Sequence, residues 1–190
     1  MSRKTLADHA GLMASEISKN PEDWERRRDA LVSMQKAVED VGQSGTVGSL
    51  VFNVELWREL KEPLKNTLND LRSAIVKEAC HLLEKLSTVS GNLMGALMRD
   101  MLTVLLQLMA NGNSVIVAQV DSCMKHVIKH TRFPRQLKEI EYRVKNSRSK
   151  DLRESIGAYV LLMLNTWPAA SMDKEAGHLQ TIISVIFFSC

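Results

Sequence analysis

Apolar residues recur every three or four positions along most of the chain, which is the spacing of amphipathic α-helices. Strict apolar–polar alternation, the pattern of β-strands, does not compete with it. In the first segment, the residues expected to share a buried face are Leu6, Leu12, Met13 and Ile17. The predicted helices are, in order, Leu6–Ile17, Trp24–Val38, Leu56–Leu68 (with Pro63 tolerated or kinking it), Leu71–Leu86, Leu93–Ala110, Val115–His130, Pro134–Asn146, Leu152–Trp167 and a last one from about Asp173.

Polar breaks arrange these helices in pairs. The breaks read NPED, NDLRS, NGNS and SRSKD, and they recur at a spacing near the 40–47 residues typical of HEAT-type helical repeats. One helix pair cannot bury its apolar face alone, so neighbouring pairs stack into a solenoid. The sequence therefore predicts an all-α fold, an α-solenoid of HEAT repeats with about four complete helix pairs and the start of a fifth, in a single domain over residues 1–190. We expect the turns within the pairs to share one edge, which would align Trp24, Arg72, Asn113 and Lys150.

Composition narrows the class of protein. Of 190 residues, 45% are hydrophobic and 25% charged, with few Gly and Pro, as in a globular helical chain. The net charge of +3 is no strong nucleic-acid signature, although residues 125–153 carry ten Lys or Arg against three acids.

Neither secretion nor a membrane span is expected. Cys80, Cys123 and Cys190 have no spacing typical of a disulfide framework, which favours a reduced, intracellular protein. The start, MSRKTLADHAG, lacks an apolar signal core. The apolar stretch LMGALMRDMLTVLLQLMA carries Arg99 and Asp100, so we expect a buried helix there.

One cysteine and two histidines are spaced so that they could bind a metal ion. Cys123, His126 and His130 form C-x2-H-x3-H on one predicted helix, but a fourth zinc ligand is not evident. We expect Cys123 inside the fold and the histidines on a basic helix. There is no HExxH base, nucleophile elbow, phosphate loop or dinucleotide fingerprint, so we expect no enzyme, no cofactor and no metal.

Four segments carry a family resemblance. DWERRRDAL, NDLRSAIVKEACHLLEKLS, VIKHTRFPRQL and LLMLNTW resemble, in order and spacing, the TOG domains of the CLIP-associating protein (CLASP) family, over about Pro21 to Trp167. Crescerin-type TOG domains, found with ciliary microtubules, share these motifs and stay open as an alternative. The resemblance implies a six-HEAT paddle that binds αβ-tubulin through the intra-repeat loops of one edge.

The resemblance also assigns tubulin-binding roles. The positions that match are Trp24 in the first turn, Arg72 and Ser73 in the second, Asn113, Ser114 and Val115 in the third, and Ser149, Lys150 and Arg153 in the fourth. Ser114 stands where the family often has lysine, and Glu154 interrupts what is often a run of arginines. Both departures predict weaker tubulin binding. The chain ends inside what resembles a fifth repeat, so the C-terminal part of the domain is expected to be incomplete.

The aromatic and basic residues near the first turn allow two interpretations. Trp24 either packs on the neighbouring helix, with Ile17 as a partner, or is displayed for binding; the resemblance favours display. Trp57 and Trp167 are expected in the core. The run Arg26–Arg28 suits a solvated helix face as well as a binding surface.

The resemblance implies a non-catalytic microtubule-associated regulator in the cytoplasm and on the cytoskeleton, with the spindle and the cilium as candidate places. Its expected partners are αβ-tubulin or microtubules and other cytoskeletal proteins, without nucleic acid or membrane. One alternative is a HEAT-repeat scaffold that has lost tubulin binding, which Ser114 and Glu154 favour. A second is a nucleic-acid or phospholipid binder that uses the basic stretch Lys125–Arg153.

Overall fold

The computed structural model describes residues 5–45, 47–110 and 113–188, and these ranges are helical without any β-strand. The α-helices in them are α1 (Leu6–Lys19), α2 (Trp24–Ser44), α3 (Val54–Leu68), α4 (Ser73–Ser90), α5 (Gly95–Met109), α6 (Ser114–His130), α7 (Leu137–Asn146), α8 (Lys150–Thr166) and α9 (Ala176–Phe188). Short 3-10 helices are η1 (Gly91–Met94), η2 (Pro134–Gln136), η3 (Ala169–Ser171) and η4 (Asp173–Glu175).

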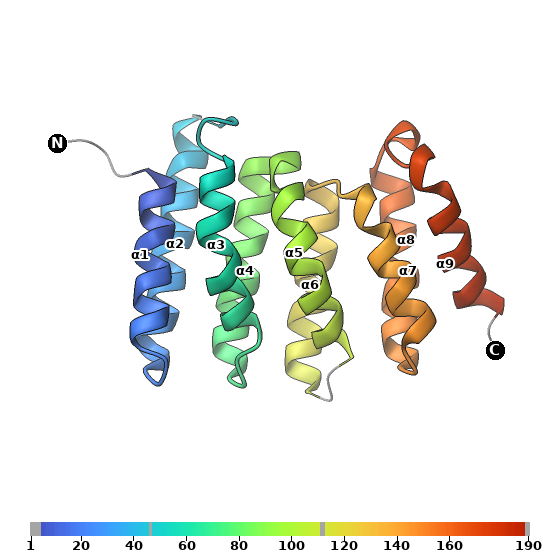
Figure 1. Ribbon diagram of the computed structural model, residues 1–190, viewed down its shortest axis with the longest axis horizontal. Helices are drawn as coiled ribbons and strands as arrows, with labels where there is room; N and C mark the ends of the chain where they lie inside the picture. Colours follow the sequence, from blue (N-terminus) through green and yellow to red (C-terminus); the bar gives the residue numbers. More distant parts are fainter. Residues whose placement is uncertain (1–4, 46, 111–112, 189–190) are drawn as a thin grey trace.

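The helices form two layers (Figure 1). One layer contains α1, α3, α5, α7 and α9, and the other contains α2, α4, α6 and α8. Within each layer, every helix packs against its counterpart in the next pair: α1 on α3, α2 on α4, and so on to α7 on α9. This stacking of helix pairs confirms the predicted all-α HEAT-type solenoid.

Side-chain caps fix the starts of five helices, three of which follow a polar break, whereas α4 begins after Arg72 without a side-chain cap. Oxygens of Thr5, Asp23, Asn53, Asn113 and Ser149 accept backbone N–H groups in the first turns of α1, α2, α3, α6 and α8. Each such cap is worth about 1 kcal/mol. Polar residues at three of the breaks, Asp23, Asn113 and Ser149, therefore stabilise the helices that follow them.

The core lies between the two layers and consists mainly of Leu, Met, Ile and Val side chains. Trp57 and Trp167 are 8% and 5% exposed, so both belong to the core, as predicted. The apolar segment around Arg99 and Asp100 forms α5, whose buried side is lined by Leu and Met. Within the described residues, no helix is both long and apolar enough to cross a membrane.

Two apolar residues do not lie where the periodicity predicted. Leu12 is 50% exposed, because it sits about 100° around the helix from the buried Met13. Leu71 is 94% exposed in the α3–α4 turn, since Arg72 is the N-cap residue and α4 begins at Ser73.

Some boundaries also differ. The predicted helix Leu93–Ala110 begins later, because Gly91, with φ of 56°, ends α4 and the 3-10 helix η1 precedes α5. Likewise η2 precedes α7, and η4 occupies the expected start of the last helix at Asp173. Asn111 and Gly112 of the NGNS break, and Cys190, lie outside the described residues.

Candidate functional site on the edge of helix turns

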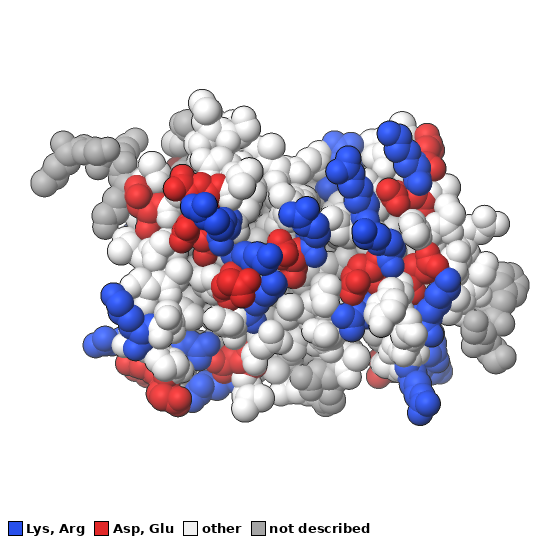
Figure 2. Space-filling view, in the orientation of Figure 1, with Lys and Arg blue, Asp and Glu red and all other residues white. Residues whose placement is uncertain are grey.

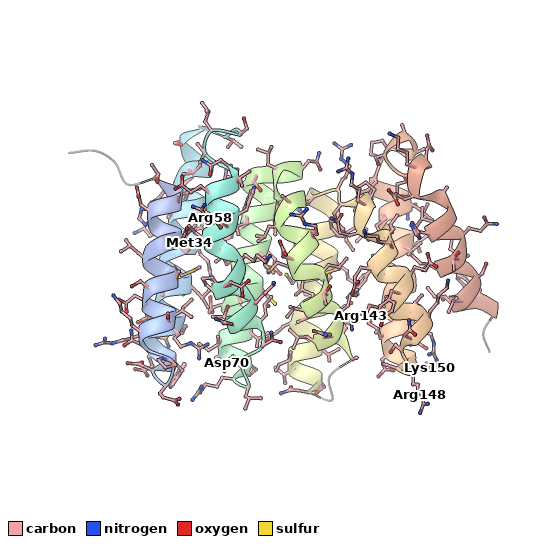
Figure 3. All side chains as sticks on the ribbon, in the orientation of Figure 1. Met34, Arg58, Asp70, Arg143, Arg148 and Lys150 are labelled. Carbon is pink, nitrogen blue, oxygen red and sulfur yellow. The ribbon has the colours of Figure 1, made fainter. Side chains whose placement is uncertain are left out.

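The α1–α2, α3–α4, α5–α6 and α7–α8 turns lie along one edge of the solenoid, at the bottom of Figure 1, and the connections between pairs lie along the opposite edge. We call the first edge, made of these turns and the first residues of the helices that follow them, the ridge. In Figure 3, Asp70 marks its second turn, and Arg148 and Lys150 mark its fourth. The repeat pattern predicted this alignment.

Trp24 is the first residue of α2, directly after the Asp23 cap, which accepts the Arg26 N–H at 3.1 Å. Its side chain is half-buried and packs against the core. The Arg28 guanidinium lies 5.3 Å from the ring centroid, and Asp29 binds that guanidinium at 2.7 Å. Trp24 therefore combines both interpretations of its sequence position: part of the ring packs inward, and part remains exposed on the ridge.

A buried ion pair joins the first two turns. Arg27 Nη1 lies 2.5 Å from Asp70 Oδ2, and the two side chains are only 9% and 6% exposed. Arg27 also donates to the Pro21 carbonyl at 3.2 Å. The run Arg26–Arg28 is thus not uniform, because its middle member is buried and holds neighbouring repeats together.

Asp70 also organises the second turn. Its other oxygen, Oδ1, accepts the Arg72 backbone N–H at 2.8 Å. The Arg72 guanidinium lies 3.7 Å from the same oxygen, and its side chain is 47% exposed. Arg72 is therefore on the ridge surface with its charge partly neutralised, and Ser73 behind it is half-buried.

In the third and fourth turns, two of the expected binding residues are helix caps. Asn113 Oδ1 accepts the N–H groups of Val115 and Ile116 at 3.1 and 3.3 Å. Ser149 Oγ accepts the Leu152 N–H at 3.1 Å. Ser114 is exposed and Val115 is 53% exposed, so these two are free to face a partner.

The cations of the fourth turn divide into two kinds. Arg153 Nη1 donates to the Ser147 carbonyl at 2.8 Å, so this arginine folds back and closes the turn. Arg148 and Lys150 instead project from the lower edge (Figure 3). Lys150 is 80% exposed at its side chain and only 3.6 Å from Glu154. Arg148 was not among the binding residues predicted from the sequence, although it lies in the basic run SRSK.

The charge of the ridge is mixed, not uniformly basic. Glu22 and Asp23 are exposed beside Trp24. A groove of about 520 Å³ between the third and fourth turns is lined by Asp121, Asp151 and several serines. The exposed cations of the ridge are Arg26 in the first turn, Arg72 in the second, and Arg148 and Lys150 in the fourth.

The C-x2-H-x3-H spacing brings its two histidines together, but Cys123 does not join them in a cluster of metal ligands within the described residues. Cys123 is fully buried and donates to the Cys80 carbonyl at 3.5 Å, and hydrogen bonding with Cys80 and burial raise the pKa of its thiol. His126 stacks on His130, with ring centroids 4.3 Å apart, and contacts the Thr88 hydroxyl at 2.8 Å. Partial burial and then His130 lower the pKa of His126. In the part of the chain that the structure describes, no group of three or more His, Cys, Asp or Glu side chains is placed to hold a metal ion.

Comparison with known proteins identifies the family to which the chain is similar. The family model described as CLASP N terminal matches residues 8–190. The chain is 28% identical over 164 residues to the CLIP-associating protein of Drosophila melanogaster, which covers 86% of this chain and 11% of that protein. It is 33% identical over 148 residues to the CLIP-associated protein of Arabidopsis thaliana, covering 78% of this chain and 10% of that protein.

A third relative, CLIP-associating protein 1-B of Xenopus laevis, is 26% identical over 182 residues, 96% of this chain and 12% of that protein. The chain thus spans about a tenth of the length of the curated relatives it matches. Among solved structures, the chain also aligns with a crystal structure of an engineered protein, with a TM-score of 0.36, 14% identity and coverage of 93% of this chain and 97% of that one.

Proposed function

The chain belongs to the CLASP N-terminal family as a TOG-type domain, and from this premise we propose that it binds αβ-tubulin, free or in the microtubule lattice, through the ridge. The proposed role is non-catalytic regulation of microtubules in the cytoplasm. The observation that carries the proposal is the alignment of all four intra-pair turns on one edge, which presents residues of distant sequence position as a single surface.

Apolar side chains that are exposed or partly exposed at three successive turns support this role. Leu71 is 94% exposed, Val115 is 53% exposed, and Trp24 is half-buried. Tryptophan is enriched among the few residues that carry most of the affinity in protein interfaces. Leucine and valine side chains gain free energy when a partner removes their apolar surface from water. Arg148 and Lys150 extend the surface with positive charge, which speeds encounter with an acidic partner and orients it more than it adds affinity.

Leu71 gives a sharp test because the chain offers a matched control. Leu50, between α2 and α3 on the opposite edge, is 93% exposed, so alanine at either position leaves the core intact. We expect Leu71→Ala to weaken co-elution with αβ-tubulin on gel filtration, with Kd raised about tenfold, the cost of losing most of one buried leucine side chain. Leu50→Ala should elute with tubulin as the wild type does.

Substitutions of Trp24 test whether the first turn contacts tubulin. We expect Trp24→Ala to abolish the shift of the tubulin peak and Trp24→Phe to retain part of it. Because Trp24 also packs on the core, thermal unfolding by circular dichroism must show that each variant is folded. Tubulin binding that survives both Trp24→Ala and Leu71→Ala in folded protein would remove the ridge as the binding surface. A folded wild type that binds neither tubulin nor microtubules would instead support a scaffold.

A further inference from the structure

A second groove lies on the edge opposite the ridge. It has a volume of about 720 Å³ and runs between η1, the start of α5 and the α6–α7 connection. Four basic residues line it: Arg99, Arg132, Arg135 and Lys138. Its size lies within the range of about 300–1,000 Å³ typical of ligand sites.

The walls of this groove are fixed by specific contacts. Thr131 Oγ1 donates to the Gly91 carbonyl at 3.0 Å, and the Arg132 N–H donates to Asn92 Oδ1 at 2.9 Å. Gly95 allows the two walls to approach, since a Cβ there would lie 3.1 Å from the Arg132 carbonyl. These contacts hold the backbone of η1 and of the α6–α7 connection in place before any ligand arrives, which lowers the entropic cost of binding.

Its positive charge is not neutralised. In the described part of the chain, no carboxylate lies within ion-pair distance of any of the four basic residues. The acid in the lining, Glu139, is already engaged by Arg143 Nε at 2.8 Å and by the Thr103 hydroxyl at 3.1 Å. Figure 2 shows Lys and Arg side chains gathered over the upper parts of α5 and α7, on the face that carries this groove.

We propose that this groove binds an extended, carboxylate-rich segment of a protein partner. Arginine side chains bind carboxylates through two parallel hydrogen bonds, and three of the four cations are arginines. The aromatic residue in the described lining, Phe133, is 2% exposed and presents no face on which a nucleic-acid base could stack. A concave site suits an inserted peptide better than a flat lipid surface.

The test uses the 190-residue chain and two double variants that remove the same charge. Arg135→Gln with Lys138→Gln alters the groove, and Arg148→Gln with Lys150→Gln alters the ridge; all four side chains are exposed, so the fold is spared. The probe is a fluorescein-labelled peptide of alternating glutamate and glycine, followed by fluorescence anisotropy, beside its glutamine counterpart. We expect the groove variant to raise the Kd for the glutamate peptide about three- to tenfold, as for two exposed ion pairs, and the ridge variant to leave it unchanged.

Several results would overturn the proposal. They are no saturable binding of the glutamate peptide at low salt, equal binding of the glutamine peptide, or equal weakening by both double variants. Tighter groove-dependent binding of a single-stranded oligonucleotide, or of phosphatidylserine vesicles, would assign the groove to another class of ligand. The groove variant should still co-elute with tubulin on gel filtration. Loss of peptide binding with tubulin binding retained would separate the groove proposal from the proposed function of the ridge.

Discussion

At the scale of single residues, Tyr159 illustrates how a buried polar group is satisfied in this fold. It is fully buried on α8, and its hydroxyl donates to Asp121 Oδ1 on α6 at 2.9 Å. Burial, and then the nearby Asp121 charge, raise the pKa of the phenol, so it remains a hydrogen-bond donor at any ordinary pH. This hydrogen bond joins α6 of the third helix pair to α8 of the fourth.

We expect Tyr159→Phe to lower the free energy of unfolding by about 1.5–3 kcal/mol, because a buried hydrogen bond to a charged acceptor is lost without a change of shape. Urea unfolding at neutral pH measures the change. Tyr142 is a matched control, since it is 58% exposed, and Tyr142→Phe should shift stability by less than about 0.5 kcal/mol. Equal effects at the two tyrosines would contradict this view of Tyr159.

At the scale of elements, polar contacts supplement the apolar core in joining successive repeats. The Arg27–Asp70 pair joins the first turn of α2 to the α3–α4 turn. At the other end of the solenoid, the Glu141 carboxylate on α7 binds His178 on α9 and Lys145 on its own helix. Such contacts set the spacing of neighbouring turns, so they matter for any surface that spans several repeats.

Asp70→Asn should destabilise the protein by about 3 kcal/mol, because it leaves the Arg27 charge buried without its partner. Asparagine keeps a side-chain oxygen that can accept the Arg72 N–H. The loss of unfolding free energy therefore measures mainly the removal of the ion pair. In a double-mutant cycle, Arg27→Met should recover much of the loss when combined with Asp70→Asn. Asp23→Asn on the same edge is the control, since asparagine caps helices as well as aspartate does. Additive losses in the cycle would show that the two side chains are not coupled.

The Glu141 contacts predict a pH dependence. Hydrogen bonds from Lys145 and then His178 lower the pKa of the Glu141 carboxyl, so its ionised form is favoured in the folded state. Stability from this group is complete above its unfolded pKa, about 4.3, and disappears as pH falls through the lower folded value. Wild type should therefore exceed Glu141→Gln in unfolding free energy at pH 7, and the gap should close towards pH 3. Glu154→Gln, which alters an exposed pair, should show little gap at either pH. A gap for Glu141→Gln that persists at pH 3 would contradict the prediction.

At the scale of the whole molecule, the two edges of the solenoid offer different surfaces. The ridge combines exposed apolar residues with mixed charge, and the opposite edge has a groove lined by unpaired cations. The stacking of helix pairs separates these surfaces, so variants at one edge leave the other intact. This separation makes the proposed tubulin contact and the proposed peptide contact testable independently.

The ridge charges should act on rate more than on affinity. We expect Arg148→Gln with Lys150→Gln to slow association with αβ-tubulin about two- to fivefold at low salt, and the difference to vanish near 1 M salt, where the Debye length is about 3 Å. Stopped-flow fluorescence measures the rate. Arg135→Gln with Lys138→Gln changes net charge equally on the opposite edge and should leave the rate unchanged. Equal slowing by both pairs would indicate attraction by net charge alone.

The sequence by itself determined the helical repeat, the paired helices and the position of most turns, because helical periodicity and polar caps act over a few neighbouring residues. Leu56, Leu60 and Leu64 on one stripe, and Asn113 and Ser149 at helix starts, needed no distant partner to be recognised. The family resemblance rested instead on the particular residues of four segments, DWERRRDAL, NDLRSAIVKEACHLLEKLS, VIKHTRFPRQL and LLMLNTW. That Trp24 and its companions bind tubulin stays a prediction.

Only the tertiary structure decided which charged residues are free. Arg27 and Arg28 are adjacent and chemically identical, yet one is buried against Asp70, 43 positions away, and the other lies over Trp24. Arg153 turns back to a carbonyl while Arg148 points outward, and Leu71 leaves the buried stripe because a turn intervenes. These outcomes depend on groups that meet only when the repeats stack, and helical spacing along the chain carries no information about which groups will meet.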